Sequence, residues 1–122
     1  MTETRLPEPT LTEIKLAAVL HALADPVRLR IAVELADGSH EMACQAFALP
    51  VTKSTSTHHF KVLREAGVIR QHRRGTSRMS CLRTEDLEEL FPGLLTSVLA
   101  AHRTEREAPD TAAAAAAAAA AD

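Results

Sequence analysis

The sequence predicts a small α+β domain that is mainly helical and carries one short β-hairpin. Three observations lead to this fold class. Apolar residues recur at helical spacing along most of the chain, two short β-type runs flank a glycine-containing turn, and basic residues gather around that turn. The chain has 122 residues, the size of one domain, so we expect a single domain at residues 10–107 behind a flexible arm at residues 1–9.

Two helices are predicted before residue 40. Thr10 and Glu13 have the spacing of a capping box, and leucines follow at helical spacing to about residue 24. Asp25 and Pro26 combine an N-cap side chain with a proline at the first helical position, which indicates the start of a second helix. Gly38 has the position of a C-terminal glycine, so this helix should end there.

A polar-faced helix is predicted from about residues 52–54 to Gly67, after a shorter helical piece at about residues 41–47. Its apolar residues make only a narrow stripe, which we assign to the buried side: Phe60, Leu63 and Ala66. The remaining positions carry mostly hydroxyl, imidazole and ammonium groups. Such a surface is poor for burial and suits contact with a polar partner.

A β-hairpin and a further helix follow. Residues 68–72 and 77–82 are predicted to form the two strands, with Gly75 in the turn between them. Basic residues precede this glycine, so the tip of the hairpin is basic. A helix with an acidic first turn then begins at about Thr84, in agreement with the helix dipole, and Pro92 with Gly93 breaks or kinks it.

The final helix carries a continuous apolar stripe. It consists of Leu94, Leu95, Val98 and Leu99. In so short a chain this stripe has little to pack against, and pairing across a two-fold axis would bury it. We therefore expect a homodimer that uses this helix, and the alternative is a helix packed in the core of a single protomer.

Charge is distributed unevenly along the chain. Residues 51–83 contain eight basic residues and one acidic residue, a balance of +7, whereas the rest of the chain has a balance of −9. Positive charge gathered in one third of an acidic protein indicates an anionic partner on one face. Outside the alanine run, no apolar stretch approaches the ~20 residues of a membrane span, and the N-terminus lacks an apolar signal, so we expect a cytoplasmic protein.

Several classes of site are disfavoured. The sequence has no nucleophile elbow, no glycine-rich phosphate loop and no catalytic pair of carboxylates, so we do not expect an enzyme. Cys44 and Cys81 lie 37 positions apart without a CxxC pattern, which argues against a disulfide framework or a zinc knuckle. Ten consecutive alanines occupy residues 112–121, and we expect a disordered or unassigned tail over residues 108–122.

The order of these elements describes a winged helix-turn-helix, and two segments make the assignment specific. Residues 23–31 (LADPVRLRI) resemble the second helix of the ArsR/SmtB family of bacterial repressors. Residues 53–69 (KSTSTHHFKVLREAGVI) resemble the recognition helix of that family and the start of its wing. The resemblance extends over about residues 11–101. One departure is Ser56, where the family usually has an aliphatic residue.

The resemblance implies a homodimer, joined through its first and last helices, that binds an inverted-repeat DNA operator. The recognition helix at about residues 53–66 would enter the major groove, with the basic wing at about residues 68–82 beside it. Its short polar side chains would meet base edges and nearby phosphates: Ser54, Thr55, Thr57 and His58. Longer cations on the helix would reach phosphates: Lys53, Lys61 and Arg64. Those on the wing would reach the DNA backbone or the minor groove: Arg73, Arg74 and Arg78.

Three nearby side chains receive other assignments. His59 has two interpretations, a DNA contact or a hydrogen-bonded histidine packed at the base of the helix. Arg28 and Arg30 are expected to form salt bridges on a helix surface rather than DNA contacts.

Many members of the family sense metal ions, but neither of its ligand patterns is complete in this sequence. The thiolate pattern needs a CxC at the third helix, where only Cys44 is present, out of register. The pattern between the last helices needs paired acids and histidines, where only His102 is present. Two candidate sites for nickel or zinc remain: His40 with Cys44, and His102 with Glu105 and a group from the partner subunit.

The sequence therefore leaves more than one candidate for the effector and for the binding partner. Besides nickel or zinc, a separate sensor or co-regulator protein is a candidate for the effector. If no metal binds, we expect the two cysteines to be small buried side chains. The alternative function is a winged-helix interaction module whose basic face docks an acidic protein. A steep salt dependence and a sequence preference in duplex binding distinguish DNA recognition from such docking.

Overall fold

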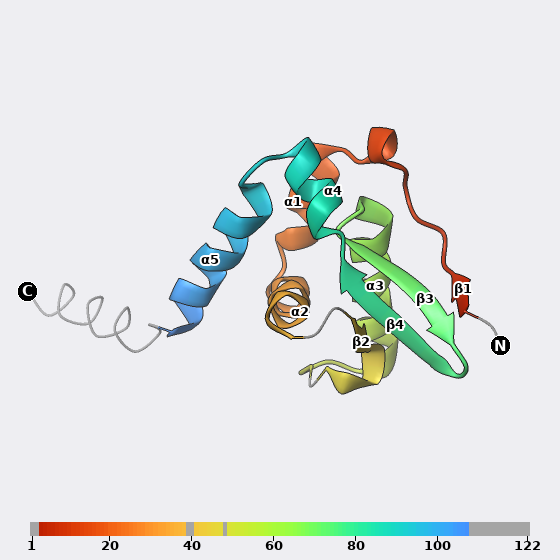
Figure 1. The fold of residues 1–122 in the computed structure, drawn as a ribbon. Helices are drawn as coiled ribbons and strands as arrows, with labels where there is room; N and C mark the ends of the chain where they lie inside the picture. Colours follow the sequence, from red (N-terminus) through yellow and green to blue (C-terminus); the bar gives the residue numbers. More distant parts are fainter. Residues whose placement is uncertain (1–2, 39–40, 48, 108–122) are drawn as a thin grey trace, which may run out of the picture.

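A computed structural model describes residues 3–38, 41–47 and 49–107 and confirms the predicted α+β fold class (Figure 1). The α-helices are α1 (Leu16–Leu23), α2 (Pro26–Asp37), α3 (Lys53–Ala66), α4 (Thr84–Leu90) and α5 (Leu94–Glu107). The strands are β1 (Glu3–Arg5), β2 (Met42–Ala43), β3 (Ile69–Arg74) and β4 (Ser77–Leu82), and two 3₁₀ turns are η1 (Leu11–Glu13) and η2 (Cys44–Ala46). The strands form one antiparallel sheet in the order β1-β3-β4-β2. The tail expected at residues 108–122 lies outside the described residues.

The predicted start and end of α2 are confirmed. The Oδ1 atom of Asp25 accepts hydrogen bonds from the N–H groups of Val27 (2.8 Å) and Arg28 (3.1 Å), which satisfies two free donors of the first turn. Pro26 follows at the first helical position, and Gly38 ends the helix by donating its N–H to the Glu34 carbonyl over 2.9 Å.

The limits of α3 also agree with the sequence. The Thr52 hydroxyl accepts the N–H of Thr55 over 3.3 Å at the start of the helix. Gly67 ends it with φ 89°, in the left-handed region that favours glycine. The next N–H, of Val68, returns to the Leu63 carbonyl over 3.0 Å. Gly67 also lies against Ile14, because a Cβ at this position would be 2.6 Å from Ile14 Cγ1.

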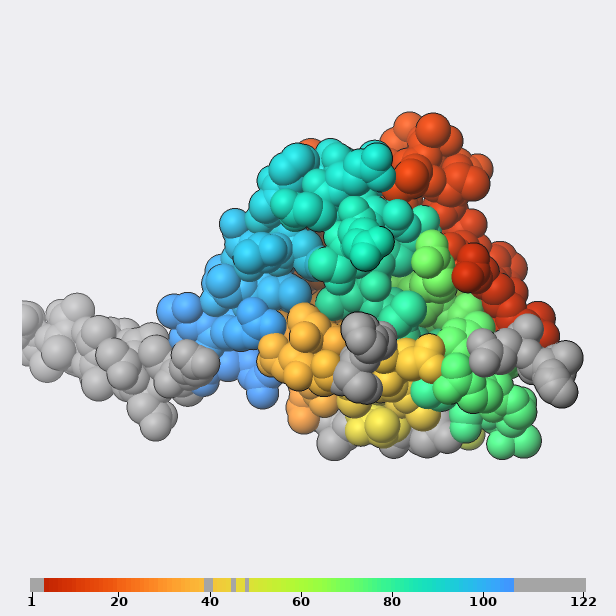
Figure 2. Space-filling view, viewed as in Figure 1, coloured from red at the N-terminus to blue at the C-terminus, as the bar shows by residue number. Residues whose placement is uncertain are grey.

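The N-terminal arm, which the sequence predicts to be flexible, pairs with the wing over its described part. Glu3–Arg5 forms β1 and pairs antiparallel with β3, and the Leu6 N–H donates to the Gln71 carbonyl over 3.0 Å. The arm thereby pairs with the free edge of β3 from Gln71 to Arg74. In the space-filling view the N-terminal segment covers one side of the wing (Figure 2).

The short helix predicted at residues 41–47 is wrong in its first part. Met42 and Ala43 form β2 and pair with Ser80 and Met79 of β4, so that only the turn η2 follows them. The sheet provides hydrogen-bond partners here that the local sequence does not indicate.

The last helix belongs to the core of the protomer. Leu95 and Leu99 are only 6% and 4% exposed, because α5 packs against α2 and α4. The expectation that the apolar stripe lacks an internal partner is therefore wrong for these two residues, whereas Leu94 and Val98 stay partly exposed. Three large apolar side chains are exposed in η1 and α1: Leu11, Leu16 and Leu20.

None of the described helices is long and apolar enough to cross a membrane.

Candidate nucleic-acid interface

The helix α3 is divided into a buried stripe and a polar exposed face, as the sequence predicts. Its inward residues Phe60, Leu63 and Ala66 belong to the core. The exposed face carries most of the side chains that the sequence assigned to DNA: Lys53, Ser54, Thr55, Thr57, His58 and Lys61. Ser56 is half-buried, on the core side of the helix.

Hydroxyl groups at the start of α3 also form hydrogen bonds with neighbouring groups of the same helix. The Thr57 hydroxyl donates to the Lys53 carbonyl over 3.0 Å, and the Thr52 hydroxyl donates to that of Thr55 over 3.0 Å. A hydroxyl that uses its proton in this way keeps oxygen lone pairs as acceptors. The Thr57 oxygen is therefore suited to accept from amino groups on base edges, such as those of adenine or cytosine.

The wing is the β-hairpin of β3 and β4, and its loop has two residues, Gly75 and Thr76. Arg74 pairs with Ser77 at the end of the strands, and Gly75 has φ 62° at the first position of the loop, the place of glycine in a type II′ turn. Arg73 is exposed next to this turn. Arg74 is engaged, because its Nη2 lies 2.7 Å from Oε1 of Glu41.

Arg64 has an internal role that the sequence did not indicate. Its Nε donates to the Pro7 carbonyl over 3.1 Å, and its Nη1 donates to Oε1 of Gln71 over 2.7 Å. Gln71 is fully buried and in turn donates to Ser80 Oγ over 2.9 Å. Arg64 thus connects α3 to the N-terminal arm and to the sheet, a role that the sequence did not predict.

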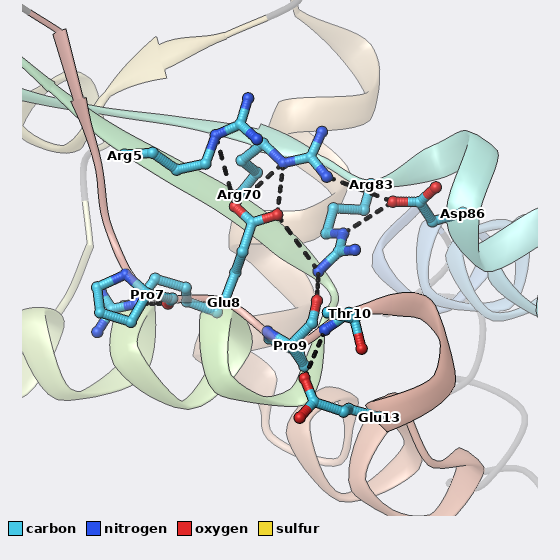
Figure 3. A network of polar contacts seen from close by, with 10 residues as sticks. Arg5, Pro7, Glu8, Pro9, Thr10, Glu13, Arg70, Arg83 and Asp86 are labelled. Atoms are coloured by element: carbon cyan, nitrogen blue, oxygen red, sulfur yellow. Dashed lines mark hydrogen bonds and ion pairs between the residues drawn. The ribbon is translucent and has the colours of Figure 1, made fainter.

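Two more arginines of the basic segment are neutralised by the arm and by α4 (Figure 3). Glu8 accepts from Arg70 Nε over 2.8 Å, and its Oε2 lies 3.7 Å from Arg83 Nη1. Arg83, whose side chain is 3% exposed, also donates to the Pro9 carbonyl (2.7 Å) and to Asp86 (3.0 Å). The +7 balance of the segment therefore overstates the charge that is available to a partner.

Only some of the basic side chains in residues 51–83 therefore lack an acidic partner. Within the part of the chain that the structure describes, no acidic group pairs with Lys53, Lys61, Arg73 or Arg78. Lys53, at the start of α3, and Arg78, on β4, line the same hollow. The helix α3 and the wing therefore present positive charge on a shared surface.

His59 packs at the base of α3. It is 8% exposed, and its Nδ1 lies 3.0 Å from Nη1 of Arg28. Burial, and the nearby charge of Arg28, lower the pKa of His59. Arg28 is itself buried, so its predicted surface position is wrong, whereas Arg30 forms the predicted surface ion pair with Glu34 over 3.1 Å.

The candidate metal ligands do not form a complete site. In residues 3–38, 41–47 and 49–107, no three His, Cys, Asp or Glu side chains are grouped so that they could hold a metal ion. His40, proposed with Cys44, lies outside these residues. His102 Nδ1 lies 4.0 Å from Oε1 of the exposed Glu105, and a metal ion there would need ligands from a second subunit.

Comparison with known proteins identifies the family. The model of the bacterial regulatory protein family arsR matches residues 25–71, which extend from the cap of α2 through α3 into β3. YceK of Bacillus subtilis (strain 168), described as an uncharacterized HTH-type transcriptional regulator, is 30% identical over 84 residues, which are 67% of this chain and 84% of that protein. The chain belongs to the ArsR family.

The fold of this ArsR-family transcriptional regulator has a counterpart among solved structures. A crystal structure of another ArsR family transcriptional regulator superposes with a TM-score of 0.53 at 22% identity, and the match covers 75% of this chain and 86% of the other. At this identity the likeness supports the winged-helix fold.

Proposed function

We propose that this ArsR-family regulator binds an inverted-repeat DNA operator as a homodimer and controls transcription from it. One observation carries the proposal: the exposed polar face of α3 and the basic wing share one surface, on which Lys53 and Arg78 have no acidic partner among the described residues. A positive surface next to an exposed polar helix fits the phosphate backbone and the major groove. Such a role implies a cytoplasmic protein.

The contacts divide into two classes. Lys53, Lys61, Arg73 and Arg78 are assigned to phosphates. Ser54, Thr55, Thr57 and His58 are assigned to base edges and nearby phosphates. Arg64 and Arg74 are left out of this proposed interface, because Arg64 is bonded to Pro7 and Gln71 and Arg74 is paired with Glu41 at the surface.

The homodimer is proposed through the N-terminal helix together with α5. Leu16 and Leu20 lie one helical turn apart on α1 and are 46% and 43% exposed, so that water contacts much of both side chains. Sedimentation of Leu20→Glu should give the mass of a monomer, where the unchanged chain gives that of a dimer. Ala18→Glu is a matched control, since Ala18 is exposed on α1 but on a different face. A dimer that survives Leu20→Glu would exclude this seam.

DNA binding is tested by fluorescence anisotropy with a duplex that carries the DNA upstream of the gene for this chain, and with a scrambled duplex. We expect preference for the upstream duplex and a steep loss of affinity with salt. Equal and weak binding to both would contradict operator recognition and favour an acidic protein partner.

Repeating the titration with chelator, and then with nickel or zinc, tests whether a metal ion is the effector. A co-regulator protein is the remaining candidate if metal has no effect.

A further inference from the structure

A hollow of about 700 Å³ lies between α3, the turn η2 and the wing. Its walls include Cys44 and Phe47 near η2, Phe60 on α3, and Thr76 and Arg78 on the wing. These elements meet at the end of the molecule where α3 begins (Figure 1). The volume falls within the range of about 300–1,000 Å³ that is usual for small-molecule sites.

The inner wall of the hollow is apolar and fixed in position. The rings of Phe47 and Phe60 pack edge to face, with centroids 5.3 Å apart and planes at 66°. Both are buried, and the half-buried Leu49 and Val51 extend the apolar wall. A flat aromatic or aliphatic group placed here would leave water without displacing a core side chain.

The lining of the hollow also carries positive charge. Lys53 and Arg78 both line it, and none of the described lining residues is acidic. Cys44 adds no negative charge at neutral pH, because burial raises the pKa of its thiol. The hydroxyls of Ser56, Thr57 and Thr76 complete the polar side. An apolar wall beside two cations fits a molecule with an apolar body and one anionic group.

We propose that this hollow is a binding site for a small aryl or alkyl carboxylate. The apolar part would pack on the half-buried Leu49 and Val51, beside the Phe47–Phe60 pair. The carboxylate would bind the Arg78 guanidinium in a bidentate pair, with Lys53 nearby. Lys53, Thr57 and Arg78 also belong to the proposed DNA interface. A bound carboxylate would therefore compete with DNA phosphates, and this consequence rests on the proposed function.

Binding is tested without DNA, with 1-naphthoate as the probe and with two matched compounds. The uncharged 1-naphthamide keeps the rings, and acetate keeps the carboxylate. In titrations followed by amide NMR shifts and calorimetry, 1-naphthoate should shift signals of Cys44, Phe47 and Phe60 and bind at least about tenfold more tightly than either matched compound. Absence of these shifts at millimolar 1-naphthoate, or equal affinity for all three compounds, would overturn the proposal.

A pair of variants separates the site from a general attraction to basic surface. Arg78→Gln should weaken 1-naphthoate binding about tenfold. Arg73→Gln removes an exposed cation of the same wing that does not line the hollow, and it should leave the affinity unchanged. An equal loss in both variants means that the anion binds the basic face without using the hollow, which contradicts the proposal.

A final titration adds the duplex. Saturating 1-naphthoate should lower the affinity for DNA at least about tenfold in the unchanged chain, and 1-naphthamide should not. If 1-naphthoate occupies the hollow and duplex affinity stays the same, the competition is wrong. If the chain binds no duplex, the proposed function fails, and the direct titration still decides whether the carboxylate site exists.

Discussion

Arg28 donates a hydrogen bond from Nη1 to Nδ1 of His59 over 3.0 Å, and this bond connects α2 to α3. A guanidinium has only donors, so His59 Nδ1 accepts and the imidazole is neutral, with its proton on Nε2. Arg28 Nε also donates to the Ala22 carbonyl at the end of α1 over 2.6 Å. One buried side chain therefore joins α1, α2 and α3, and it satisfies a carbonyl that the end of α1 leaves free.

The first prediction concerns Arg28→Lys. An ammonium cannot reach the Ala22 carbonyl and His59 Nδ1 in the geometry of the guanidinium, so at least one buried polar atom loses its partner. We expect a loss of about 2 kcal/mol in the free energy of unfolding, measured by urea denaturation. Arg30→Lys is the matched control, because the Arg30–Glu34 pair lies on the surface and should contribute less than about 0.5 kcal/mol. Similar losses in the two variants would show that the buried connection adds nothing.

The second prediction is a pH dependence that arises from His59. Burial lowers the pKa of His59, Arg28 and His58 lower it further, and Asp25 opposes them. Below about pH 6.5 the unfolded chain binds a proton that the folded chain does not, so the stabilisation is complete above this pH and is lost as pH falls through the lower folded pKa.

The pH prediction is measured as urea midpoints of the unchanged chain and of His59→Asn. The asparagine oxygen can accept from Arg28 in the place of Nδ1 but does not titrate, so the decline in stability below about pH 6.5 should be shallower in this variant. His58→Asn removes the exposed neighbour and should keep the steeper decline. Parallel curves for the unchanged chain and His59→Asn would exclude His59 as the source.

The third prediction concerns the attachment of the N-terminal arm. Glu8→Gln removes the negative charge that faces Arg70 and the buried Arg83, and Asp86 then remains as their acidic partner. We expect a loss of about 1–2 kcal/mol in the free energy of unfolding. Hydrogen exchange of the Leu6 amide, which is bonded to Gln71, should become faster.

Arg5→Gln is the control for the arm. Arg5 is 65% exposed and lies 3.9 Å from Glu8, so its removal should change stability by less than about 0.5 kcal/mol. Slow exchange at Leu6 in Glu8→Gln would mean that the β1–β3 pairing holds the arm without the carboxylate.

The fourth prediction compares two glycines with positive φ. Gly67→Ala places a Cβ 2.6 Å from Ile14 Cγ1 at φ 89°, so steric overlap adds to the strain of the left-handed conformation. We expect a loss of about 2–4 kcal/mol in unfolding free energy. At Gly75 (φ 62°) the added Cβ has no neighbour within 4 Å, and Gly75→Ala should cost about 1 kcal/mol. Equal costs would show that Ile14 moves aside without penalty.

The parts of the fold that sequence predicted are those set by local contacts. Asp25, Thr52 and Gly67 act on backbone groups within a few residues, so the limits of α2 and α3 can be predicted from their positions. The attachment of the arm cannot be predicted in this way. Its partners lie far along the chain, as with Glu8 and Arg70, 62 residues apart, and no local pattern indicates such a pair.

The candidate interface has the same division between local and distant contacts. Helical spacing identifies the exposed face of α3, because the buried stripe of Phe60, Leu63 and Ala66 determines which side faces inward. Spacing does not distinguish Lys61 from Arg64, since both are cations on that helix. They differ only in their surroundings: Lys61 is exposed, and Arg64 is bonded to the distant Pro7 and to Gln71.

The fifth prediction uses this difference. Each phosphate contact contributes about 0.9 to the slope of log affinity against log salt, so Lys61→Gln should reduce the slope by about 1 per subunit, on upstream and scrambled duplexes alike. Arg64→Gln should leave the slope unchanged and lower the free energy of unfolding by about 1–2 kcal/mol, because its bonds to Pro7 and Gln71 are lost. If Arg64→Gln reduces the slope as much as Lys61→Gln does, Arg64 leaves its internal partners and contacts DNA. Anisotropy titrations at four or more salt concentrations, with each variant shown to be folded, distinguish the two roles.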